Sequence, residues 1–86
     1  MDITLGQESI HKTHQNSFRK EIFCSRCSGT SRIAFVAHEG IDSNPSYSIS
    51  EYYDNEPNSM WVHDYVAVAV YFCTECLNAD AKFNQA

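Results

Sequence analysis

Cys24-Ser25-Arg26-Cys27 and Cys73-Thr74-Glu75-Cys76 have the same cysteine spacing. These two Cys-x2-Cys motifs contain all four cysteines of the 86-residue chain. A tetrahedral thiolate site needs two such pairs, because the tight turn within each pair points both sulfurs at one ion. The 45 residues between the pairs leave room for a small sheet that closes the second pair onto the first. The spacing therefore predicts one structural zinc ion bound by Cys24, Cys27, Cys73 and Cys76.

Other uses of four cysteines fit the sequence less well. Disulfides would suit an oxidising compartment, but Met1-Asp2-Ile3-Thr4-Leu5-Gly6 lacks the positive segment and apolar run of a signal peptide. We therefore expect a cytoplasmic protein with reduced cysteines. A thioredoxin-like redox motif is disfavoured, because the crossover helix of a βαβ unit has no counterpart in the sequence. Iron in a rubredoxin-like site uses the same four thiolates, so the spacing leaves zinc and iron both open.

The length of the chain makes the metal part of its stability. Eighty-six residues form one domain with a limited core, which a metal commonly supplements. Structural zinc is worth on the order of 10 to 16 kcal/mol at neutral pH, comparable with the whole stability of a typical domain. We therefore expect the metal-free chain to be largely unfolded. The longest apolar run, Tyr65 to Cys73, is far shorter than the ~18 residues of a membrane span, which predicts a soluble protein without a membrane partner.

Charge is distributed unevenly along the chain, whose formal net charge is -5. Five of the six basic residues lie within the first 32 positions, and none lies between Ile33 and Ala81. That stretch contains eight acidic residues, and four thiolates on one zinc ion would add about two further negative charges. The distribution predicts an acidic body with a weakly basic N-terminal side.

The residue pattern predicts a polar N-terminal arm followed by a domain. Residues 1–20 have few large apolar side chains and are expected to be a mobile arm or one weak helix. Residues 21–86 form the four-cysteine domain, with predicted strands at 21–23, 32–38, 46–53 and 61–72 and a predicted helix at 77–86. Zinc knuckles usually place glycine directly after the second cysteine. Here Ser28 precedes Gly29, which predicts a turn shifted by one residue.

Over residues 22–86 the arrangement resembles a treble-clef zinc domain. In that fold a knuckle carries the first pair, here Cys24 and Cys27, and the first turn of a helix supplies the second, here Cys73 and Cys76. The resemblance implies a small α+β domain with a three-stranded antiparallel sheet and a C-terminal helix. A zinc ribbon, in which both pairs lie on knuckles at hairpin tips, is the alternative. In size and acidity the chain also resembles small phage-encoded accessory proteins.

Catalytic chemistry has little support in the sequence. Four thiolates fill every position around a zinc ion, whereas a catalytic zinc keeps one position open. The chain has no glycine-rich phosphate loop and no Ser-His-Asp spacing. Its four histidines, His11, His14, His38 and His63, are expected to be structural or exposed, because the cysteines already complete a metal site. We therefore expect a protein that is not an enzyme.

A protein partner fits the acidic half of the chain best, because aromatic anchors within a charged rim are the composition of interface hot spots. The predicted partner-binding residues are Tyr47, Glu51, Tyr52, Tyr53, Asp54, Glu56 and Trp61. Their charge favours a basic protein partner. An acidic surface can also act as an inhibitor, by competing for a nucleic-acid-binding groove on the partner.

Nucleic acid is the alternative partner. Contacts to phosphate require cations, and the basic residues of the N-terminal side are Lys12, Arg19, Lys20, Arg26 and Arg32. The cation-free stretch that follows them makes this alternative less favoured than a protein partner.

Overall fold

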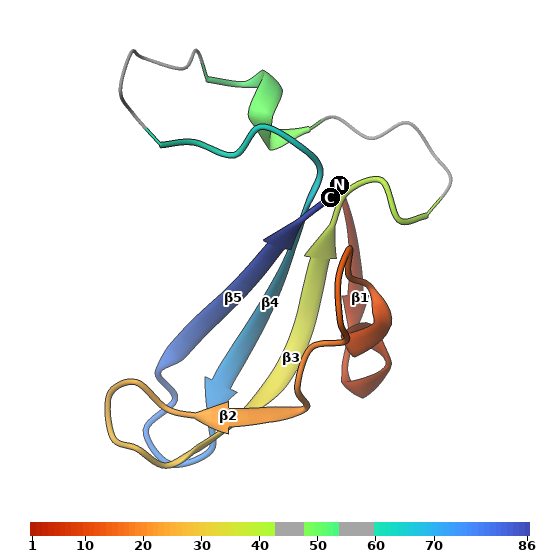
Figure 1. Cartoon of the computed structure of the whole chain (residues 1–86). Helices are drawn as coiled ribbons and strands as arrows, with labels where there is room; N and C mark the ends of the chain where they lie inside the picture. Colours follow the sequence, from red (N-terminus) through yellow and green to blue (C-terminus); the bar gives the residue numbers. More distant parts are fainter. Residues whose placement is uncertain (43–47, 54–59) are drawn as a thin grey trace.

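The described residues form one five-stranded antiparallel sheet (Figure 1). The computed structural model describes residues 1–42, 48–53 and 60–86. Its elements are, in chain order, β1 (Asp2–Leu5), the 3-10 helix η1 (Gln7–His11), β2 (Glu21–Phe23), β3 (Thr30–His38), the 3-10 helix η2 (Ile49–Glu51), β4 (Val66–Cys73) and β5 (Ala79–Gln85). The strand order is β1-β3-β4-β5, and β2 also pairs with β3.

β3 is a central strand. Its edge away from β4 is shared by β2 and β1, and a β-bulge lies where one partner follows the other. β2 pairs with the first half of this edge and β1 with the second half. The register against β4 shifts between Ile33 and Phe35, where the bulge lies. There the Ile33 amide donates to the Lys20 carbonyl at 2.9 Å, and the Ala34 carbonyl accepts from the Gly6 amide at 2.7 Å. The edge therefore passes from one partner to the other while these backbone groups stay paired.

Alternation along β4 separates a covered face of the sheet from an open one. Ala67, Ala69 and Tyr71 point to the covered face and are buried, whereas Val68 and Val70 between them are only partly buried. The core consists of Ile33, Val36, Ala67, Ala69 and Tyr71, with Ile10, Phe18, Ile22 and Ile41 packed against it. The core thus lies between one face of the sheet and the N-terminal segment.

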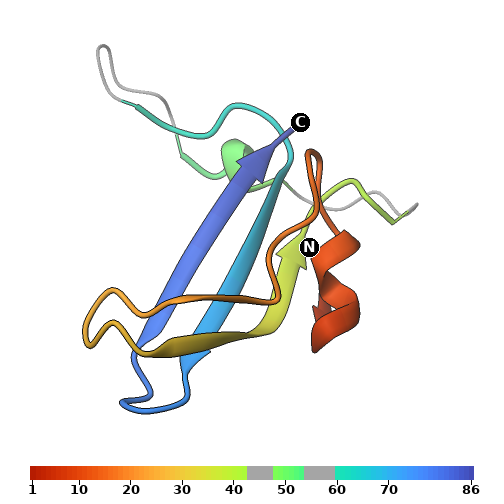
Figure 2. The same cartoon turned by 60° about the horizontal axis from the view of Figure 1, so that its bottom comes forward.

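The N-terminal segment reaches from one edge of the sheet to the other. β1 and η1 lie beside β3, and the chain then runs to the end of β5, where the His14 amide donates to Asn84 Oδ1 at 3.2 Å. The Asn84 side chain donates in turn to Thr13 Oγ1 at 2.6 Å. Figure 2 shows this segment in orange on its way back to β2. The composition of residues 1–20 did not predict the strand β1.

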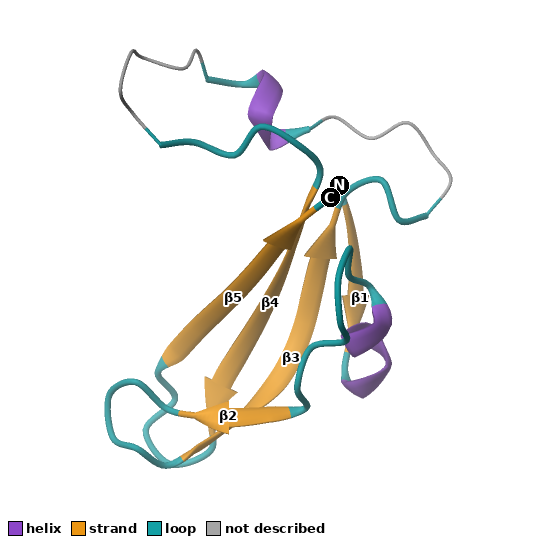
Figure 3. Cartoon of the chain, viewed as in Figure 1, coloured by secondary structure: helices purple, strands orange, loops and turns teal. Residues whose placement is uncertain are grey.

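The predicted C-terminal helix is wrong, because Ala79–Gln85 form strand β5 (Figure 3). The predicted treble-clef-like α+β class is therefore also wrong. The described residues form a sheet of five strands instead of the predicted three, with two short 3-10 helices, neither long and apolar enough to cross a membrane. The physical reason lies in the pairing of β4. One edge of β4 pairs with β3, and without β5 the backbone groups of its other edge would have no partner beside a buried face. A lone helix of about ten residues has little stability in water, so pairing with β4 is preferred.

Two predicted strands also differ from the structure. The strand predicted over 61–72 starts only at Val66. Within the strand predicted over 46–53, residues 48–53 contain η2, and positions 46 and 47 lie outside the described residues. Ser48 Oγ accepts a hydrogen bond from the Ser50 amide at 3.3 Å and caps this helix. Serine side chains compete for backbone groups in this way and so favour caps and turns over strands.

Candidate metal centre

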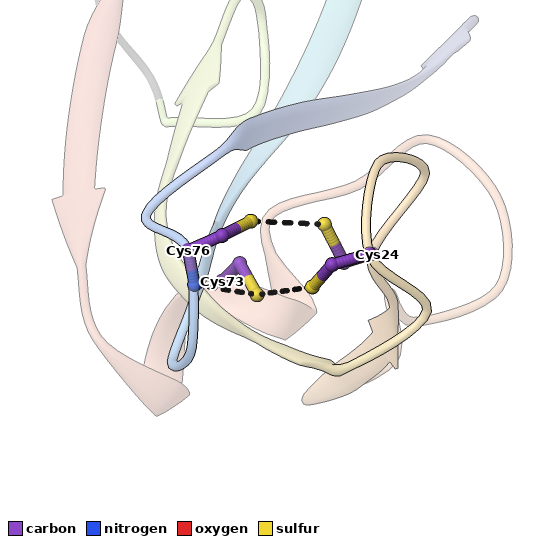
Figure 4. Close-up of side chains that lie close together, drawn as sticks. Cys24, Cys73 and Cys76 are labelled. Carbon is purple, nitrogen blue, oxygen red and sulfur yellow. Dashed lines mark hydrogen bonds between the residues drawn. The ribbon is translucent and has the colours of Figure 1, made fainter.

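Both cysteine pairs lie on hairpin turns. Cys24 and Cys27 lie between β2 and β3, whereas Cys73 ends β4 and Cys76 lies in the turn that leads to β5. Pairing of β3 with β4 places Ser31 opposite Cys73 and so brings the two turns together. Figure 4 shows the sulfurs of the two turns facing each other. The location of both pairs on hairpin turns is the feature that separates a zinc ribbon from a treble clef.

The four sulfurs have the spacing of a tetrahedral metal site. Cys24 Sγ lies 3.7 Å from Cys76 Sγ (Figure 4). Cys27 Sγ lies 3.5 Å from Cys73 Sγ. A zinc–sulfur bond of about 2.3 Å implies sulfur–sulfur edges of about 3.8 Å in a regular tetrahedron. A disulfide bond is only about 2.05 Å long, and all four cysteines are free. The four cysteines could therefore hold a metal ion, as their spacing in the sequence predicts.

The two turns share one backbone conformation. In the first, the Cys24 amide donates to the Gly29 carbonyl at 2.8 Å, five residues along the chain. In the second, the Cys73 amide donates to the Asn78 carbonyl at 2.9 Å, again five residues along. The repeated sequence spacing is thus matched by a repeated local structure.

Each turn needs a residue with positive φ directly after its second cysteine. Ser28 has a φ of 63° and Leu77 a φ of 60°. The predicted shift of the first turn towards Gly29 is therefore wrong, because Ser28 itself adopts the left-handed conformation. A residue with a Cβ atom pays a steric cost there of roughly 1 to 2 kcal/mol. The positive φ at this position turns the chain so that both sulfurs of a pair point to one place, which offsets the steric cost when a metal is bound.

Backbone amides surround the sulfurs with hydrogen-bond donors. The Arg26 amide lies 3.3 Å from Cys24 Sγ, and the Gly29 amide lies 3.4 Å from Cys27 Sγ. In the second turn, the amides of Glu75 and Cys76 both lie 3.4 Å from Cys73 Sγ. Such donors stabilise negative charge on sulfur, which is the form that binds a metal.

The buried cysteine of each pair is the more acidic one. The backbone N–H of Cys27 lowers the pKa of Cys24 to about 6, and that of Cys76 likewise lowers the pKa of Cys73. For Cys27, the Gly29 N–H acts to lower the pKa, but the hydrogen bonds with neighbouring thiols and partial burial outweigh it and raise the pKa to about 12. A bound metal needs four thiolates, so its binding would release the protons of the less acidic thiols.

Asp80 joins the two turns at their outer side. Its Oδ1 accepts from the Ser25 hydroxyl at 2.5 Å, and its Oδ2 accepts from the Ser25 amide at 3.0 Å. The Asn78 side chain donates to Ser25 Oγ at 3.3 Å. The bonds from the Ser25 hydroxyl and amide hold the pKa of Asp80 below its usual range. A charged carboxylate at the start of β5 therefore fixes the position of the other turn, a role typical of groups that orient metal ligands.

Replacing Leu77 by glycine should stabilise the metal-loaded protein by about 0.5 to 1 kcal/mol. Glycine relieves the steric cost of positive φ, and this gain exceeds the extra freedom that glycine brings to the unfolded chain. Leu77 is 79% exposed, so little packing is lost. The measurement is the free energy of unfolding in urea at a fixed zinc concentration.

The control for this prediction is Leu77→Ala, which removes the same exposed side chain but keeps the Cβ atom. It should leave the free energy of unfolding within about 0.5 kcal/mol of the parent protein. Equal stabilisation by alanine and glycine would show that positive φ at this position carries no cost.

The residues predicted to bind a partner are only partly within the described structure. Tyr47, Asp54 and Glu56 lie outside the described residues. Glu51 is exposed at the end of η2, and the following Tyr52 and Tyr53 are 69% and 68% exposed. The rings of Tyr53 and Trp61 meet edge to face, with centroids 5.1 Å apart. The structure thus brings two of the predicted aromatic residues together.

An apolar surface that sequence reasoning missed lies on the open face of the sheet. The strand registers place Ile3, Leu5, Phe35, Val68, Val70, Phe72 and Phe83 on this side. The rings of Phe35 and Phe72 meet edge to face at 6.4 Å. Phe83 is 61% exposed and Leu5 74% exposed. The signal in the sequence is the alternation of Ala79, Ala81 and Phe83 with polar residues, which is typical of a strand.

The basic residues of the N-terminal side are distributed over separate places. Lys12 forms an ion pair with Asp42, with 2.8 Å between Nζ and Oδ1. Lys20 and Arg32 line one hollow, and Arg19 lines another. Within the described ranges, Lys20 and Arg32 therefore lie together, Arg19 shares its hollow with Lys82, and Lys12 is paired with Asp42.

Known proteins provide no relative from which to transfer a role. No family model, no curated protein and no solved structure matches the chain. The role of the metal centre and of the surfaces therefore has to be inferred from their own geometry.

Proposed function

We propose that the protein is a non-catalytic, zinc-stabilised module that binds a basic protein partner through its open face and the adjoining Tyr53–Trp61 pair. The observation that carries the proposal is the open face, an apolar surface of several large exposed side chains on an otherwise acidic protein. Soluble monomers seldom leave such a surface exposed unless it binds something.

Zinc is the ion that this centre fits best. Four cysteine thiolates around a tetrahedral zinc ion form a closed site, which is typical of structural zinc. The ion would be held by the two turns and would lock the β2–β3 hairpin to the β4–β5 hairpin. A closed site has no position for a substrate or a reactive water molecule, which supports a structural role over catalysis.

The size of the open face suits recognition of a protein. Aromatic side chains each present about 150 to 250 Å², so the exposed fractions of Phe72, Phe83 and Trp61 together amount to roughly 300 Å². Ile3 and Leu5, 62% and 74% exposed, enlarge this area further. The whole face therefore matches the largest apolar patches of soluble monomers, which are often functional.

A shallow apolar hollow lies within this surface and offers a place for an anchoring side chain. It is lined by Ile49, Trp61, Val62, Val66, Val68, Ala81 and Phe83. Trp61 belongs both to this hollow and to the contact with Tyr53. The hollow thus joins the open face to the predicted aromatic residues, and interface hot spots usually lie in pockets.

Charge favours a basic partner over a second copy of the chain. The protein has a formal net charge of -5, and four thiolates on zinc would make it more negative. Two copies meeting at the open face would bring two acidic bodies together, whereas a basic partner is attracted at low salt. The occupant is therefore a protein segment with an apolar or aromatic anchor and flanking lysine or arginine residues.

Selection from a random peptide library against the zinc-loaded protein tests this proposal. The selected peptides should combine aromatic or aliphatic anchors with lysine or arginine, and their affinity should fall as salt increases. Phe83→Ser should raise the dissociation constant of such a peptide roughly 10- to 100-fold, the effect of losing a hot spot. Titration calorimetry measures this change.

The matched control is Phe23→Ser, because Phe23 is an equally apolar aromatic residue that is 84% exposed and lies on β2, at the opposite end of the sheet from the hollow. It should leave peptide affinity within about twofold of the parent value. Peptides without excess positive charge, or equal losses for Phe83→Ser and Phe23→Ser, would contradict the proposal. A stable dimer in sedimentation velocity would identify a second copy as the occupant, and competition by oligonucleotides would favour nucleic acid.

A further inference from the structure

His38 is a buried histidine that uses only one of its two ring nitrogens for a hydrogen bond within the described residues. It ends β3, is 1% exposed, and its Nε2 lies 2.9 Å from Thr4 Oγ1 on β1. Its Nδ1 is buried and has no hydrogen-bond partner within the described residues. A buried polar atom without a partner lowers stability and calls for an explanation.

One carboxylate lies near this unpartnered nitrogen, and a second belongs to the same cluster of side chains. Asp2 is opposite His38 in the register of β1 with β3, and Asp42 Oδ2 lies 3.9 Å from Nδ1. One ligand atom from each of Asp2, His38 and Asp42 lies within 4.8 Å of the other two. In the part of the chain that the structure describes, this group and the four cysteines are the two clusters with metal-ligand spacing.

Neither protonation arrangement of a neutral ring satisfies Nδ1. Burial of the ring, which is 1% exposed, disfavours its charged form. If Nε2 carries the proton, the Nδ1 lone pair faces the Asp42 carboxylate. If Nδ1 carries it, 3.9 Å is too long for a hydrogen bond to Asp42. A cation between the three groups would satisfy all of them.

We propose that Asp2, His38 and Asp42 form a second metal site, which binds a divalent first-row transition ion such as Mn²⁺ or Zn²⁺. One imidazole nitrogen and two carboxylates suit such ions, and water would complete the coordination. Thr4 Oγ1 would accept the proton of Nε2, as the second partner of a metal-binding histidine usually does. The hydrogen bond to Thr4 thereby leaves Nδ1 free to bind the ion.

Lys12 tunes the strength of this site. Its Nζ lies 2.8 Å from Asp42 Oδ1 and already neutralises part of the carboxylate charge. A metal ion must therefore compete with the lysine for Asp42, which makes the site weaker than the cysteine centre. Removal of the lysine charge should tighten binding, the opposite of the effect of removing a ligand.

The site is remote from the cysteines, so the two can be studied separately. His38 and the cysteine turns lie at opposite ends of β3, whose nine residues span about 26 Å. Thiolates prefer zinc to Mn²⁺, so the zinc-loaded protein can be titrated with Mn²⁺ without exchange at the cysteines.

NMR line broadening by Mn²⁺ in the zinc-loaded protein tests the inference. Broadening should saturate at one ion per chain and be strongest for the amides of Asp2, His38 and Asp42, with the cysteine turns unaffected. Asp2→Asn and Asp42→Asn, both at exposed positions, should each weaken Mn²⁺ binding at least tenfold. Lys12→Met should strengthen it several-fold.

Glu21→Gln is the matched control, because this exposed carboxylate lies on β2 and outside the cluster. It should leave Mn²⁺ binding unchanged. Broadening that does not saturate, or that is spread over exposed carboxylates in general, would overturn the second site. Unchanged affinity in Asp2→Asn and Asp42→Asn, or in Lys12→Met, would overturn it as well.

Discussion

Removal of the metal should unfold the protein, and so should the replacement of Cys73 by serine. Structural zinc contributes on the order of 10 to 16 kcal/mol, which equals or exceeds the total stability of most small domains. In this protein the metal centre joins two hairpins that also meet through the pairing of β3 with β4, through bonds of Ser25 with Asp80 and Asn78, and through bonds from Thr74 to the Thr30 carbonyl. NMR spectra of the chelator-treated protein should lose their dispersion and regain it when zinc is restored.

Comparison of Cys73→Ser with Cys27→Ser separates metal binding from packing. Cys73 is buried, with 1% exposure, whereas Cys27 is exposed. If folding depends on the metal, both variants should lose zinc in native mass spectrometry and unfold to a similar extent. A folded, metal-free Cys27→Ser protein would reject the dependence on metal. A red, iron-loaded protein from metal-balanced expression would show that iron takes the place of zinc.

Replacement of Glu39 by alanine should cost about 3 to 5 kcal/mol of unfolding free energy. Glu39 is fully buried, and its two carboxylate oxygens accept from the amides of Val66 and Ile49 at 3.0 and 2.7 Å. Alanine would leave both amides without their partner, each at a cost of roughly 1 to 3 kcal/mol. The test is urea unfolding at a fixed, saturating zinc concentration, since bound metal contributes to the measured stability.

Glu39→Gln should cost less than Glu39→Ala, because glutamine retains one of the two acceptor oxygens. An exposed carboxylate provides the baseline: Glu8→Ala should change the free energy of unfolding by no more than about 0.5 kcal/mol. If Glu39→Ala behaved like Glu8→Ala, the two carboxylate bonds would not hold the start of β4 to η2.

The metal ligands could be predicted from the sequence because their signal is local. Two cysteines three positions apart can share one ion whatever structure surrounds them, since the tight turn between them does most of the positioning. Cys24 with Cys27 and Cys73 with Cys76 are such pairs, and the structure brings all four sulfurs together. The conformation of Ser28 and Leu77 was less predictable, because neither residue type favours positive φ.

The structure of residues 79–85 could not be predicted locally. Their alanines, lysine and asparagine carry no strong strand preference, and a helix is an equally good local solution. What makes them a strand is the vacant edge of β4, whose backbone groups need partners. That edge belongs to the adjacent strand of the same hairpin, but β4 itself is held in place by pairing with β3, a more distant segment of the chain.

The sequence by itself therefore determined the metal ligands, the strands that deliver them and the acidic character of the body. Tertiary structure alone decided which face of the sheet the N-terminal segment covers, and it thereby left Phe72 and Phe83 exposed on the other. It also decided that Asp2, His38 and Asp42 meet at one end of β3. The physical reason is the separation of the residues along the sequence. A turn positions residues that are neighbours in the chain, whereas a face of a sheet and a ligand cluster across strands depend on the pairing of distant segments.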